Sequence, residues 1–316
     1  MESPFLVCYR PEMNDPLSQI ITLLEPRAVL SSIISGAGPW GVRYSDLGQP
    51  SFGVVLEGSC RLVVDGMEAI TLQAGDFLLM PSTPGFILSG FEPVTPVPID
   101  AKLTSTSADE IRYGTPNVPP DVRLLGSKFD FNSPNAALLI SLLPEMVLMR
   151  GVERLCVLVQ LVNEESNEQR LGRDLVLMRL VEVLMIEALR CASSEHAPPG
   201  LLRGLADPRI ALSIRQMHAA IGRAWTMAQL AKEASLSRSA FYERFSRVVG
   251  MPPMEYLLAW RMAVAKDLLH RQDISIAEVA ERVGYGSASS FSTAFSRCVG
   301  KPPGHYARES RYAWQS

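Results

Sequence analysis

The sequence has few of the features that define secreted, disulfide-linked or membrane proteins. Its 316 residues include five cysteines, scattered without paired spacing, which argues against a disulfide framework and favours free thiols in a reducing cytoplasm. The first residues lack a basic stretch leading into a long apolar run, so no signal peptide is expected. Prolines and charges interrupt the apolar stretches before membrane-spanning length. We therefore expect a cytoplasmic protein without a membrane partner.

Acidic and basic residues are divided unevenly along the chain. The net charge of the whole chain is −3, which by itself is unpromising for a nucleic-acid binder. Residues 1–200 carry −10, with 14 Lys and Arg against 24 Asp and Glu, whereas residues 201–316 carry +7, with 16 against 9. Attraction to phosphates requires such a basic segment. The C-terminal third is thus the candidate for binding a nucleic acid.

That basic segment contains one helical pattern written twice, between residues 226 and 306. Ala228 and Ala231 match Ala277 and Ala280 at a spacing of 49 residues. Further along, the spacing becomes 50, for the pairs Phe241 and Phe291, Phe245 and Phe295, Gly250 and Gly300, Pro252 and Pro302, and Tyr256 and Tyr306. A turn between two helices can absorb the difference. Two copies are too few for a solenoid, so we interpret the repeat as a duplicated functional unit.

Each copy is predicted to be a short helix, a tight turn and a second helix, over residues 226–247 and 274–297. Ser237 and Ser287 stand where N-caps belong, and Gly250 and Gly300 stand where a helix stops. The second helix of each copy has one apolar stripe: Phe241, Phe245, Val248 and Val249, then Phe291, Phe295, Cys298 and Val299. Its opposite face is short and polar, and can lie in the major groove of DNA.

Residues 254–271 connect the two copies as one predicted helix, about 27 Å long. That length is of the order of the ~34 Å between successive major grooves on one side of a duplex. The alternative is a helical domain whose polar faces are merely solvated. Both copies keep their apolar and polar residues at the same positions around the helix, which favours DNA binding.

These residues resemble the DNA-binding domain of AraC/XylS-type transcriptional regulators. The resemblance covers about 100 residues, including the linker segment 261–269 and the segments 276–285 and 291–303. By position it implies base-reading roles for Ser239, Tyr242, Glu243, Ser289, Ser292 and Thr293. Contacts to phosphates or at helix ends are expected from Ser237, Arg238, Arg244, Arg247, Ser287, Ser296, Arg297 and Lys301, with a structural role left open for Arg244. Neither polar face has an arginine at its centre, so small hydroxyls and DNA shape are expected to carry more of the specificity than direct reading of guanine.

The acidic N-terminal part has the pattern of a β-sandwich or small barrel. After a helix-like stretch at 16–26, Gly and Pro separate seven short segments of β character: 29–34, 40–44, 52–57, 60–64, 68–72, 77–80 and 86–89. Gly58 and the pair Asp65-Gly66 are turn signals. Residues 92–135 are predicted to be loops, with one strand at 122–131.

The segments 54–62 and 72–81 resemble a cupin, and more narrowly the cupin sensing domain of one branch of the AraC/XylS regulators. Cupin enzymes hold a metal with several His and a Glu, yet none of the four histidines here precedes residue 196. We therefore expect no metal, no cofactor and no catalysis. The interior is expected either to be a filled core or to hold a small, partly apolar effector. Candidate lining residues are Trp40, Phe52, Val54 and Phe86, with Arg43 and Arg61 either meeting an anionic group or simply solvated.

Three helices are predicted at 136–149, 152–169 and 173–193. The apolar residues of the last one form a stripe wider than one amphipathic face, so we expect it to be covered on two sides. One side can pack on the barrel and the other on a second copy of the chain; burial within one chain is the alternative. Residues 194–206 are predicted to be a linker, and Asp207-Pro208 starts the next helix.

The sequence thus predicts a two-domain α+β protein. Residues 1–193 form a cupin-like effector-binding and dimerisation domain, and residues 207–316 an all-α domain with two helix-turn-helix units. The predicted function is that of a one-component, sequence-specific DNA-binding transcriptional regulator that reads two adjacent major-groove segments. Expected partners are double-stranded DNA, a second copy of the chain, a small-molecule effector if one exists, and RNA polymerase if the protein is an activator. The alternatives are a cupin oxygenase or isomerase with a helical appendage, and a protein-interaction module that no longer binds DNA.

Overall fold

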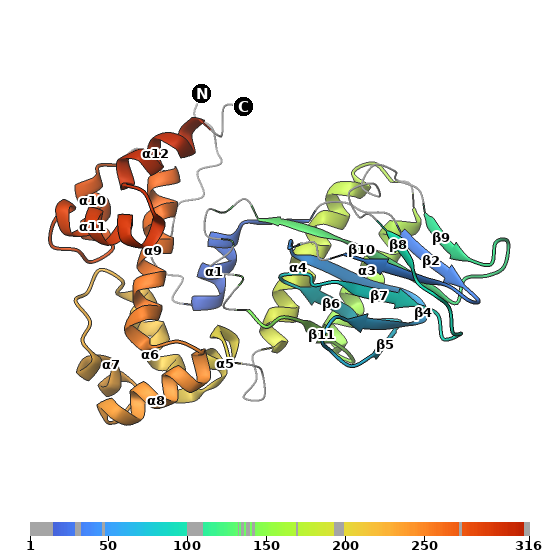
Figure 1. The fold of residues 1–316 in the computed structure, drawn as a ribbon, viewed down its shortest axis with the longest axis horizontal. Coiled ribbons are helices and arrows are strands. Elements are labelled where there is room, and N and C mark those ends of the chain that lie inside the picture. The colour runs from blue at the N-terminus through green and yellow to red at the C-terminus, as the bar shows by residue number, and fades with distance from the viewer. Residues whose placement is uncertain are drawn as a thin grey trace. The chain divides into compact units, whose positions relative to one another are not determined.

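A computed structural model describes residues 15–28, 33–45, 48–99, 110–131, 133, 136, 140, 143–168, 170–192, 199–271 and 274–312. They belong to two compact units (Figure 1). The sheet unit falls within Pro26–Asn132 and Leu143–Ala197, and the helical unit within Met1–Glu25, Ser133–Leu142 and Pro198–Ser316. Cys8, residues 193–198 around the start of the predicted linker, which include His196, and residues 137–139, 141 and 142 of the helix predicted at 136–149 lie outside the described residues.

The described strands of the sheet unit form one curled sheet. They are β1 (Pro26–Ala28), β2 (Ile33–Ala37), β3 (Gly41–Tyr44), β4 (Ser51–Val64), β5 (Ile70–Gln73), β6 (Phe77–Met80), β7 (Phe86–Ser89), β8 (Val97–Ile99), β9 (Ile111–Gly114), β10 (Val122–Phe131) and β11 (Val147–Met149). The main order is β8-β3-β7-β4-β10-β2-β9. In addition, β1 pairs with β10, β5 and β6 pair with β4, and β11 pairs with β6.

The long strand β4 holds this sheet together. Its first half pairs with β6 and β10, and its second half with β5 and β7. The sequence predicted two strands with a turn at Gly58, but the strand continues through Gly58, which has a φ of 70°. Two residues earlier, at Leu56, the register with β10 shifts, as at a β-bulge, because Arg123 pairs with Glu57 and Leu124 with Val55. A Cβ at Gly58 would overlap the carbonyl oxygen of Asp121, so glycine permits a bend here rather than a hairpin turn.

Local pattern located some strands well and missed others. Strands β6, β7 and β10 have the predicted bounds. Strands β8 and β9 lie in the stretch predicted as loops, and β11 replaces the end of the helix predicted at 136–149. These three are short, and β11 pairs with β6, about 70 residues away in sequence. Such pairing depends on tertiary context that local propensity does not contain.

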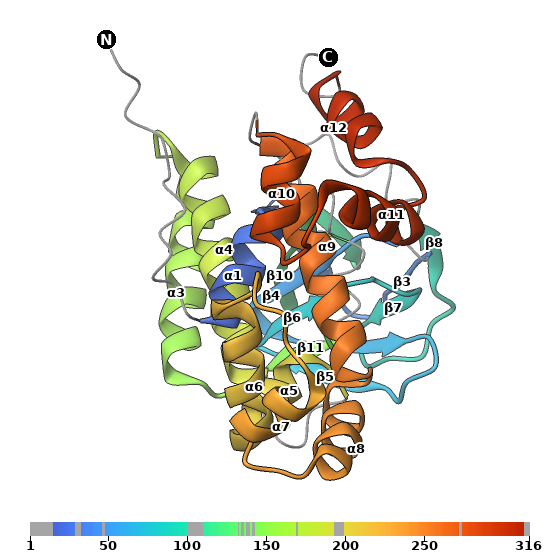
Figure 2. The same cartoon turned by 90° about the vertical axis from the view of Figure 1, so that its left-hand side faces the viewer.

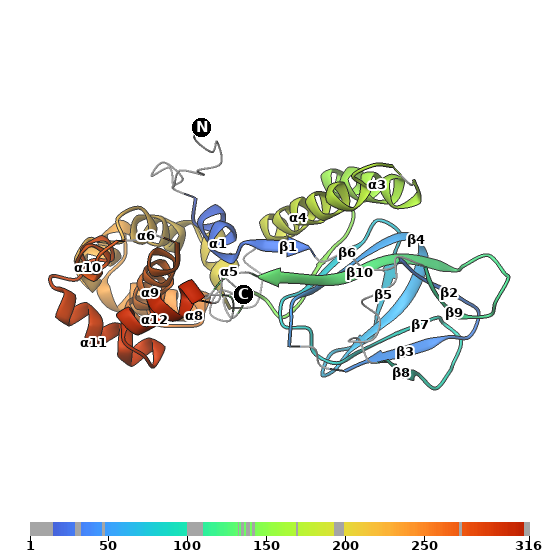
Figure 3. The ribbon, with the colours of Figure 1, turned by 90° about the horizontal axis from the view of Figure 1, so that it is seen from above.

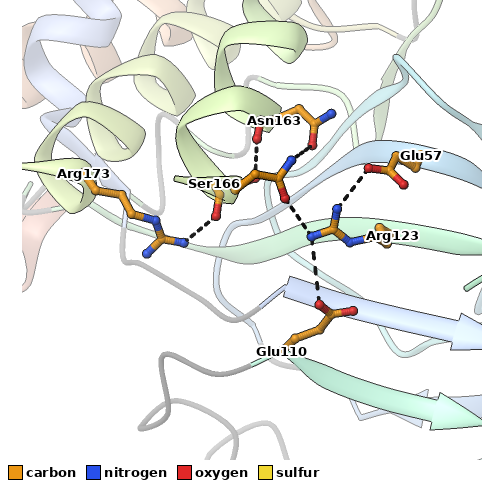
Figure 4. A network of polar contacts seen from close by, with 7 residues as sticks. Glu57, Glu110, Arg123, Asn163, Ser166 and Arg173 are labelled. Carbon is orange, nitrogen blue, oxygen red and sulfur yellow. Dashed lines mark hydrogen bonds and ion pairs between the residues drawn. The ribbon is translucent and has the colours of Figure 1, made fainter. Parts of the chain in front are cut away.

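Two helices lie side by side along the outside of the sheet, α3 (Glu153–Asn167) and α4 (Arg173–Ala192) (Figure 3). Both were predicted within two residues at each end. A polar network fixes the C-terminal end of α3 (Figure 4). Arg123 on β10 donates to Glu57 at 2.9 Å and to the Asn167 side chain at 3.0 Å. Arg173 donates to the Ser166 carbonyl at 3.0 Å, which satisfies a carbonyl that the helix end leaves unpaired.

The described helices of the helical unit are α1 (Pro16–Leu24), α5 (Leu201–Ala206), α6 (Pro208–Ala219), α7 (Met227–Glu233), α8 (Arg238–Val249), α9 (Pro253–Arg271), α10 (Ile276–Arg282), α11 (Ala288–Val299) and α12 (Pro303–Tyr312). Figures 1 and 2 show α9 running between α7 and α8 at one end and α10 and α11 at the other. The connection between the two copies is thus the single helix that the sequence predicted. Helix α5 occupies the end of the predicted linker.

Helix α1 packs on α6 and α9, a placement that the sequence did not predict. Its buried side includes Ile20 and Leu24. The ring of His218 on α6 is 5% exposed and stacks on Trp260 of α9, with centroids 4.0 Å apart. His218 Nδ1 lies 2.9 Å from the Gln19 side-chain oxygen of α1. Because that oxygen has no proton, Nδ1 donates to it. Within the described ranges, no helix is long and apolar enough to cross a membrane.

Candidate nucleic-acid interface

The two helix-turn-helix units are built by the same local interactions. Thr226 caps α7 through a capping box with Gln229, and Ser275 caps α10 by accepting from the Glu278 amide at 3.1 Å. In the first turn the Leu236 amide donates to the Ala231 carbonyl at 2.9 Å, and in the second the Tyr285 amide donates to the Ala280 carbonyl at 2.8 Å. Both turns therefore close in the same way.

The one-residue difference between the copies falls inside this turn, as predicted. Leu236 is followed directly by Ser237, the N-cap of α8, whereas Gly286 stands between Tyr285 and Ser287, the N-cap of α11. Both predicted N-caps are confirmed, because each serine side chain accepts a backbone amide, at 3.3 Å and 3.1 Å respectively. The predicted glycine stops are also confirmed. Gly250 and Gly300 have φ values of 84° and 82°, in the left-handed region that glycine favours.

The inner side of each second helix is anchored by aromatic rings. Phe241 and Phe245 on α8 are buried, with centroids 5.6 Å apart, and Phe245 meets Tyr256 at 5.7 Å. The counterparts in the second unit repeat this arrangement: Phe291 and Phe295 at 5.4 Å, and Phe295 and Tyr306 at 5.5 Å. The duplication in sequence is therefore a duplication of the packed core, which sets both second helices in the same orientation within their units.

The prediction of a buried stripe is wrong for one residue, Cys298. Val248 and Val249 are buried at the end of α8, but Cys298 is exposed at the end of α11 and Val299 is half-buried. Helix α8 is covered there by α5, which packs against it. Cys60, Cys156 and Cys191 are free thiols like Cys298, in line with the prediction for the described cysteines.

The predicted base-reading residues lie together on the outer side of each second helix. Ser239, Tyr242 and Glu243 are exposed on α8, with Tyr242 at 48%. Ser289 and Thr293 are exposed on α11, and Ser292 beside them is half-buried. Each trio is spaced i, i+3 and i+4, which puts its members on one helical face. We call these two trios the outer faces of α8 and α11.

Cationic residues lie at the ends of these faces. Arg238 and Arg247 on α8 are exposed, and no ion pair joins either to another described residue. Arg297, the counterpart of Arg247, is exposed on α11. Lys301 forms an ion pair with Glu309 on α12. Ser296 is half-buried. The three arginines are thus exposed cations at the ends of the outer faces.

Arg244 forms an ion pair within the helical unit. Its Nε donates to Asp207 Oδ2 at 2.7 Å, and Asp207 is the N-cap of α6, accepting from the Arg209 and Ile210 amides. Burial acts to raise the pKa of the Asp207 carboxyl, but the hydrogen bonds from Arg244 and from both amides outweigh it and lower the pKa below its ordinary value. The Asp-Pro helix start was predicted, but not its ion pair with a residue 37 positions away.

Four of the six candidate effector-lining residues do not face the interior of the sheet. Val42, Tyr44, Leu62, Leu78 and Met80 belong to the cluster of buried residues that fills the interior. Side chains alternate across a strand, so Arg43 and Arg61, their neighbours, point outwards. Arg43 donates to exposed Asp65 at 2.7 Å.

Phe52 and Val54 face away from the interior for the same reason. Phe52 packs on Phe77 and Phe129, with centroids 6.5 Å and 4.9 Å apart, and Phe77 is the strand partner of Val54. Because Leu78 next to Phe77 is in the interior cluster, this aromatic group lies on the opposite side of the sheet. Trp40 and Phe86 do belong to the interior cluster. A role in lining an effector site therefore stays a prediction for Trp40 and Phe86.

Nothing in the described part of the chain forms a group of three or more His, Cys, Asp or Glu side chains able to hold a metal ion. His218, the buried histidine, is engaged by Gln19, Tyr256 and Trp260. Trp225 caps the end of α6 by donating to the Ala220 carbonyl at 2.9 Å. His218 therefore packs between helices, and Trp225 closes the end of α6.

Comparison with known proteins covers both units. A family model described as a cupin matches residues 15–193, and one described as a helix-turn-helix domain matches residues 230–309. A putative AraC-like transcription regulator from Streptomyces lividans is 34% identical over 303 residues, spanning 93% of this chain and 98% of the relative. Another from Streptomyces antibioticus is 33% identical over 302 residues, with the same coverage. The solved DNA-binding domain of AdpA, in complex with a target DNA, is 30% identical, covers 34% of this chain and 96% of that one, and has a TM-score of 0.33.

These matches confirm the resemblance that the sequence motifs indicated. A cupin model spans more than half of the chain, and two AraC-like relatives match it nearly end to end. The chain belongs to the AraC-like transcription regulators, and its function is sequence-specific DNA binding in the control of transcription.

Proposed function

We propose that the protein binds DNA by placing α8 and α11 in two successive major grooves on one side of the duplex. The observation that carries the proposal is the duplicated geometry, with paired phenylalanines anchoring the inner side of each helix and polar side chains exposed on its outer face. Helix α9 has 19 residues and is therefore about 28 Å long, close to the ~34 Å groove repeat. One continuous helix holds the two outer faces at a set distance.

Base contacts are assigned to the two outer faces, and phosphate contacts to the cations at their ends. Arg238, Arg247 and Arg297 are exposed and supply charge-assisted hydrogen bonds to phosphates. The N-termini of α8 and α11, at Ser237 and Ser287, add backbone amides that favour an anion. Lys301 contacts a phosphate only after it leaves Glu309. Arg244 is assigned to the N-cap of α6 rather than to DNA.

We further propose that the sheet unit forms a homodimer through the outer side of α3 and α4. That side exposes apolar residues: Val157, Leu161, Leu175, Val176 and Val183, with exposed fractions between 40% and 55%. Exposed apolar side chains grouped on a helix pair favour a second copy over burial within one chain. A dimer presents two helical units to paired half-sites and gains affinity through effective concentration.

An effector is proposed to act through the interior of the sheet. The Trp40 ring is buried in the interior cluster, and its Nε1 has no hydrogen-bond partner among the described residues. Buried donors are normally paired, so this N–H is available to an acceptor atom of a small, partly apolar molecule.

Footprinting on DNA flanking the gene, at moderate salt, tests the DNA-binding proposal. The expected result is protection of two successive major-groove segments by the purified protein, lost or strongly weakened in Arg297→Ala. Removing one phosphate contact should also lower the salt slope of binding by about one. The matched control is Arg170→Ala, which removes an exposed arginine of the sheet unit. Equal protection of any DNA, or an equal loss in the control, would contradict the proposal.

A further inference from the structure

The centres of the two outer faces share a chemical property that arginine-based readers lack. Glu243 on α8 and Thr293 on α11 occupy the same position in the duplicated unit, 50 residues apart, and both are exposed. Each is spaced i+4 from the first serine of its trio and i−4 from the arginine at the helix end. Two copies of one unit therefore present a non-cationic group at the point best placed to meet a base edge. The inference below rests on the proposed insertion of these helices into the groove.

Two hydroxyl protons on the outer face of α11, those of Ser292 and Thr293, are already used. Thr293 Oγ1 donates to the Ser289 carbonyl at 3.1 Å, and Ser292 Oγ donates to the Ala288 carbonyl at 2.7 Å. A carbonyl has no proton, so the hydroxyl must be the donor in both contacts. Each hydroxyl has one proton and two acceptor lone pairs. What Thr293 and Ser292 offer to a ligand is therefore hydrogen-bond acceptance, together with the methyl group of Thr293.

Glu243 offers acceptors for a different reason. A carboxylate has no proton to donate, and no ion pair joins Glu243 to another residue in the described ranges. Phosphates repel it, so on a helix in the groove its favourable partners are on the base edges. Glu243 and Thr293 are thus alike in offering acceptors at the same position of the two units, although their side chains differ.

Only two bases present a donor in the major groove. These are cytosine, through its N4 amino group, and adenine, through its N6 amino group, and an A·T pair also presents the thymine methyl. We propose that Glu243 reads the N4 amino group of a cytosine and that Thr293 reads the N6 amino group of an adenine while its methyl group packs on a thymine methyl. Glu243 and Thr293 are in this way the residues that set base preference at the centre of each half of the site.

The same chemistry excludes guanine at both positions. Guanine presents two acceptors, N7 and O6, in the major groove. Facing a carboxylate, or a hydroxyl whose proton is held within the helix, these acceptors meet lone pairs without a proton between them. The preference at these positions therefore comes from an attractive contact to the amino group and a repulsive contact to guanine.

Selection from a randomised duplex library tests this assignment with the full chain. Wild type, Glu243→Gln and Thr293→Val are compared at one salt concentration. The position read by each residue is the one whose preference changes in its variant. Wild type is expected to enrich cytosine at the first position and adenine at the second. Glu243→Gln should shift the first from cytosine to adenine, because Gln pairs with adenine N6 and N7, and Thr293→Val should lose the adenine preference by about fivefold to tenfold.

A modified duplex isolates the single hydrogen bond. Replacing the selected adenine by purine, which lacks the 6-amino group, should weaken wild-type binding by about fivefold or more and leave Thr293→Val unchanged. Thr22→Val is the control, because the exposed Thr22 hydroxyl also donates to the carbonyl four residues earlier, that of Ser18 at 2.8 Å, but lies on α1 and not on either outer face. Guanine enrichment at either position, or an equal effect of purine on wild type and variant, would overturn this inference and leave the DNA-binding proposal intact. Absence of any selected sequence would overturn both.

Discussion

At the scale of single residues, the turns of the two helix-turn-helix units place different residues in the same left-handed backbone conformation. Gly284 has a φ of 82°, and Ser235 takes the matching place in the first unit with a φ of 53°. A non-glycine residue in the left-handed region costs about 1 kcal/mol or more. The first turn is therefore strained where the second is not, although both close with the same backbone hydrogen bond.

We predict that Ser235→Gly stabilises the helical unit by about 0.5–1 kcal/mol, because relief of the left-handed strain exceeds the added chain entropy of glycine. Urea unfolding monitored by helical circular dichroism measures the change. The opposite substitution, Gly284→Ala, should destabilise, since its Cβ would lie 2.6 Å from Arg261 Nη2 and 2.7 Å from the Gly222 carbonyl oxygen. A lower midpoint for Ser235→Gly would show that the serine makes a contribution beyond its backbone conformation.

At the scale of elements, α1 and α6 meet α9 through a buried histidine. His218 is fully enclosed by Gln19 of α1 and by Tyr256 and Trp260 of α9. Burial lowers the pKa of His218 from 6.5 to about 3, so the ring is neutral in the folded protein. The unfolded chain takes up a proton between these two values and the folded chain does not. Stability from this site is therefore complete above pH 6.5 and is lost progressively as the pH falls towards 3.

The predicted consequence is a pH dependence that His218→Gln removes. Wild type should lose about 2 kcal/mol of unfolding free energy between pH 7 and pH 5 through this residue, since one pKa unit corresponds to about 1.4 kcal/mol. The variant is less stable at pH 7 but should lack that part of the slope. Urea titrations of both proteins at pH 7, 6 and 5 measure the difference, in which the other titrating groups cancel. Parallel slopes would mean that His218 titrates normally in the folded chain.

The elements also show which parts of the fold local sequence determines. The caps at Ser237 and Ser287, the glycine stops and the helix α9 were predicted because their signals lie within a few residues of each other. Strand β11 and the bend at Gly58 were not, because each depends on a strand far away in sequence. The placement of α1 could not be predicted for the same reason, since His218 lies 199 positions from Gln19.

Among the candidate site residues, the DNA-facing set was easier to predict than the effector set. The duplication showed which side of α8 and α11 is buried, and each trio does lie on the exposed side. The strands offered no such second copy, and a choice between two alternating faces put Phe52 and Val54 on the wrong one. The ion pair of Arg244 could not be predicted either. An arginine that is exposed and an arginine that is paired to a distant N-cap look the same in the local sequence.

At the scale of the whole molecule, the N-terminal two thirds and the C-terminal third of the chain differ in charge. The basic residues 201–316 attract DNA, while the acidic residues 1–200 are repelled by it. A monomer would hold one helical unit against this repulsion, whereas a dimer joined through the sheet units brings two helical units to one DNA. Assembly through α3 and α4 is therefore expected to matter more for affinity on paired half-sites than on a single one.

The decisive substitution is Leu175→Glu, at a side chain of α4 that is 55% exposed. Folding should be preserved because the position is on the surface, but a charge within an apolar contact should leave the protein monomeric at micromolar concentration. Affinity for DNA with two half-sites should fall by about 100-fold or more, and affinity for one half-site should not change. Sedimentation equilibrium and gel-shift titration measure the two effects. Phe91→Glu, in the sheet unit but outside α3 and α4 and 59% exposed, is the control. A wild-type monomer, or a Leu175→Glu dimer, would place the assembly surface elsewhere on the chain.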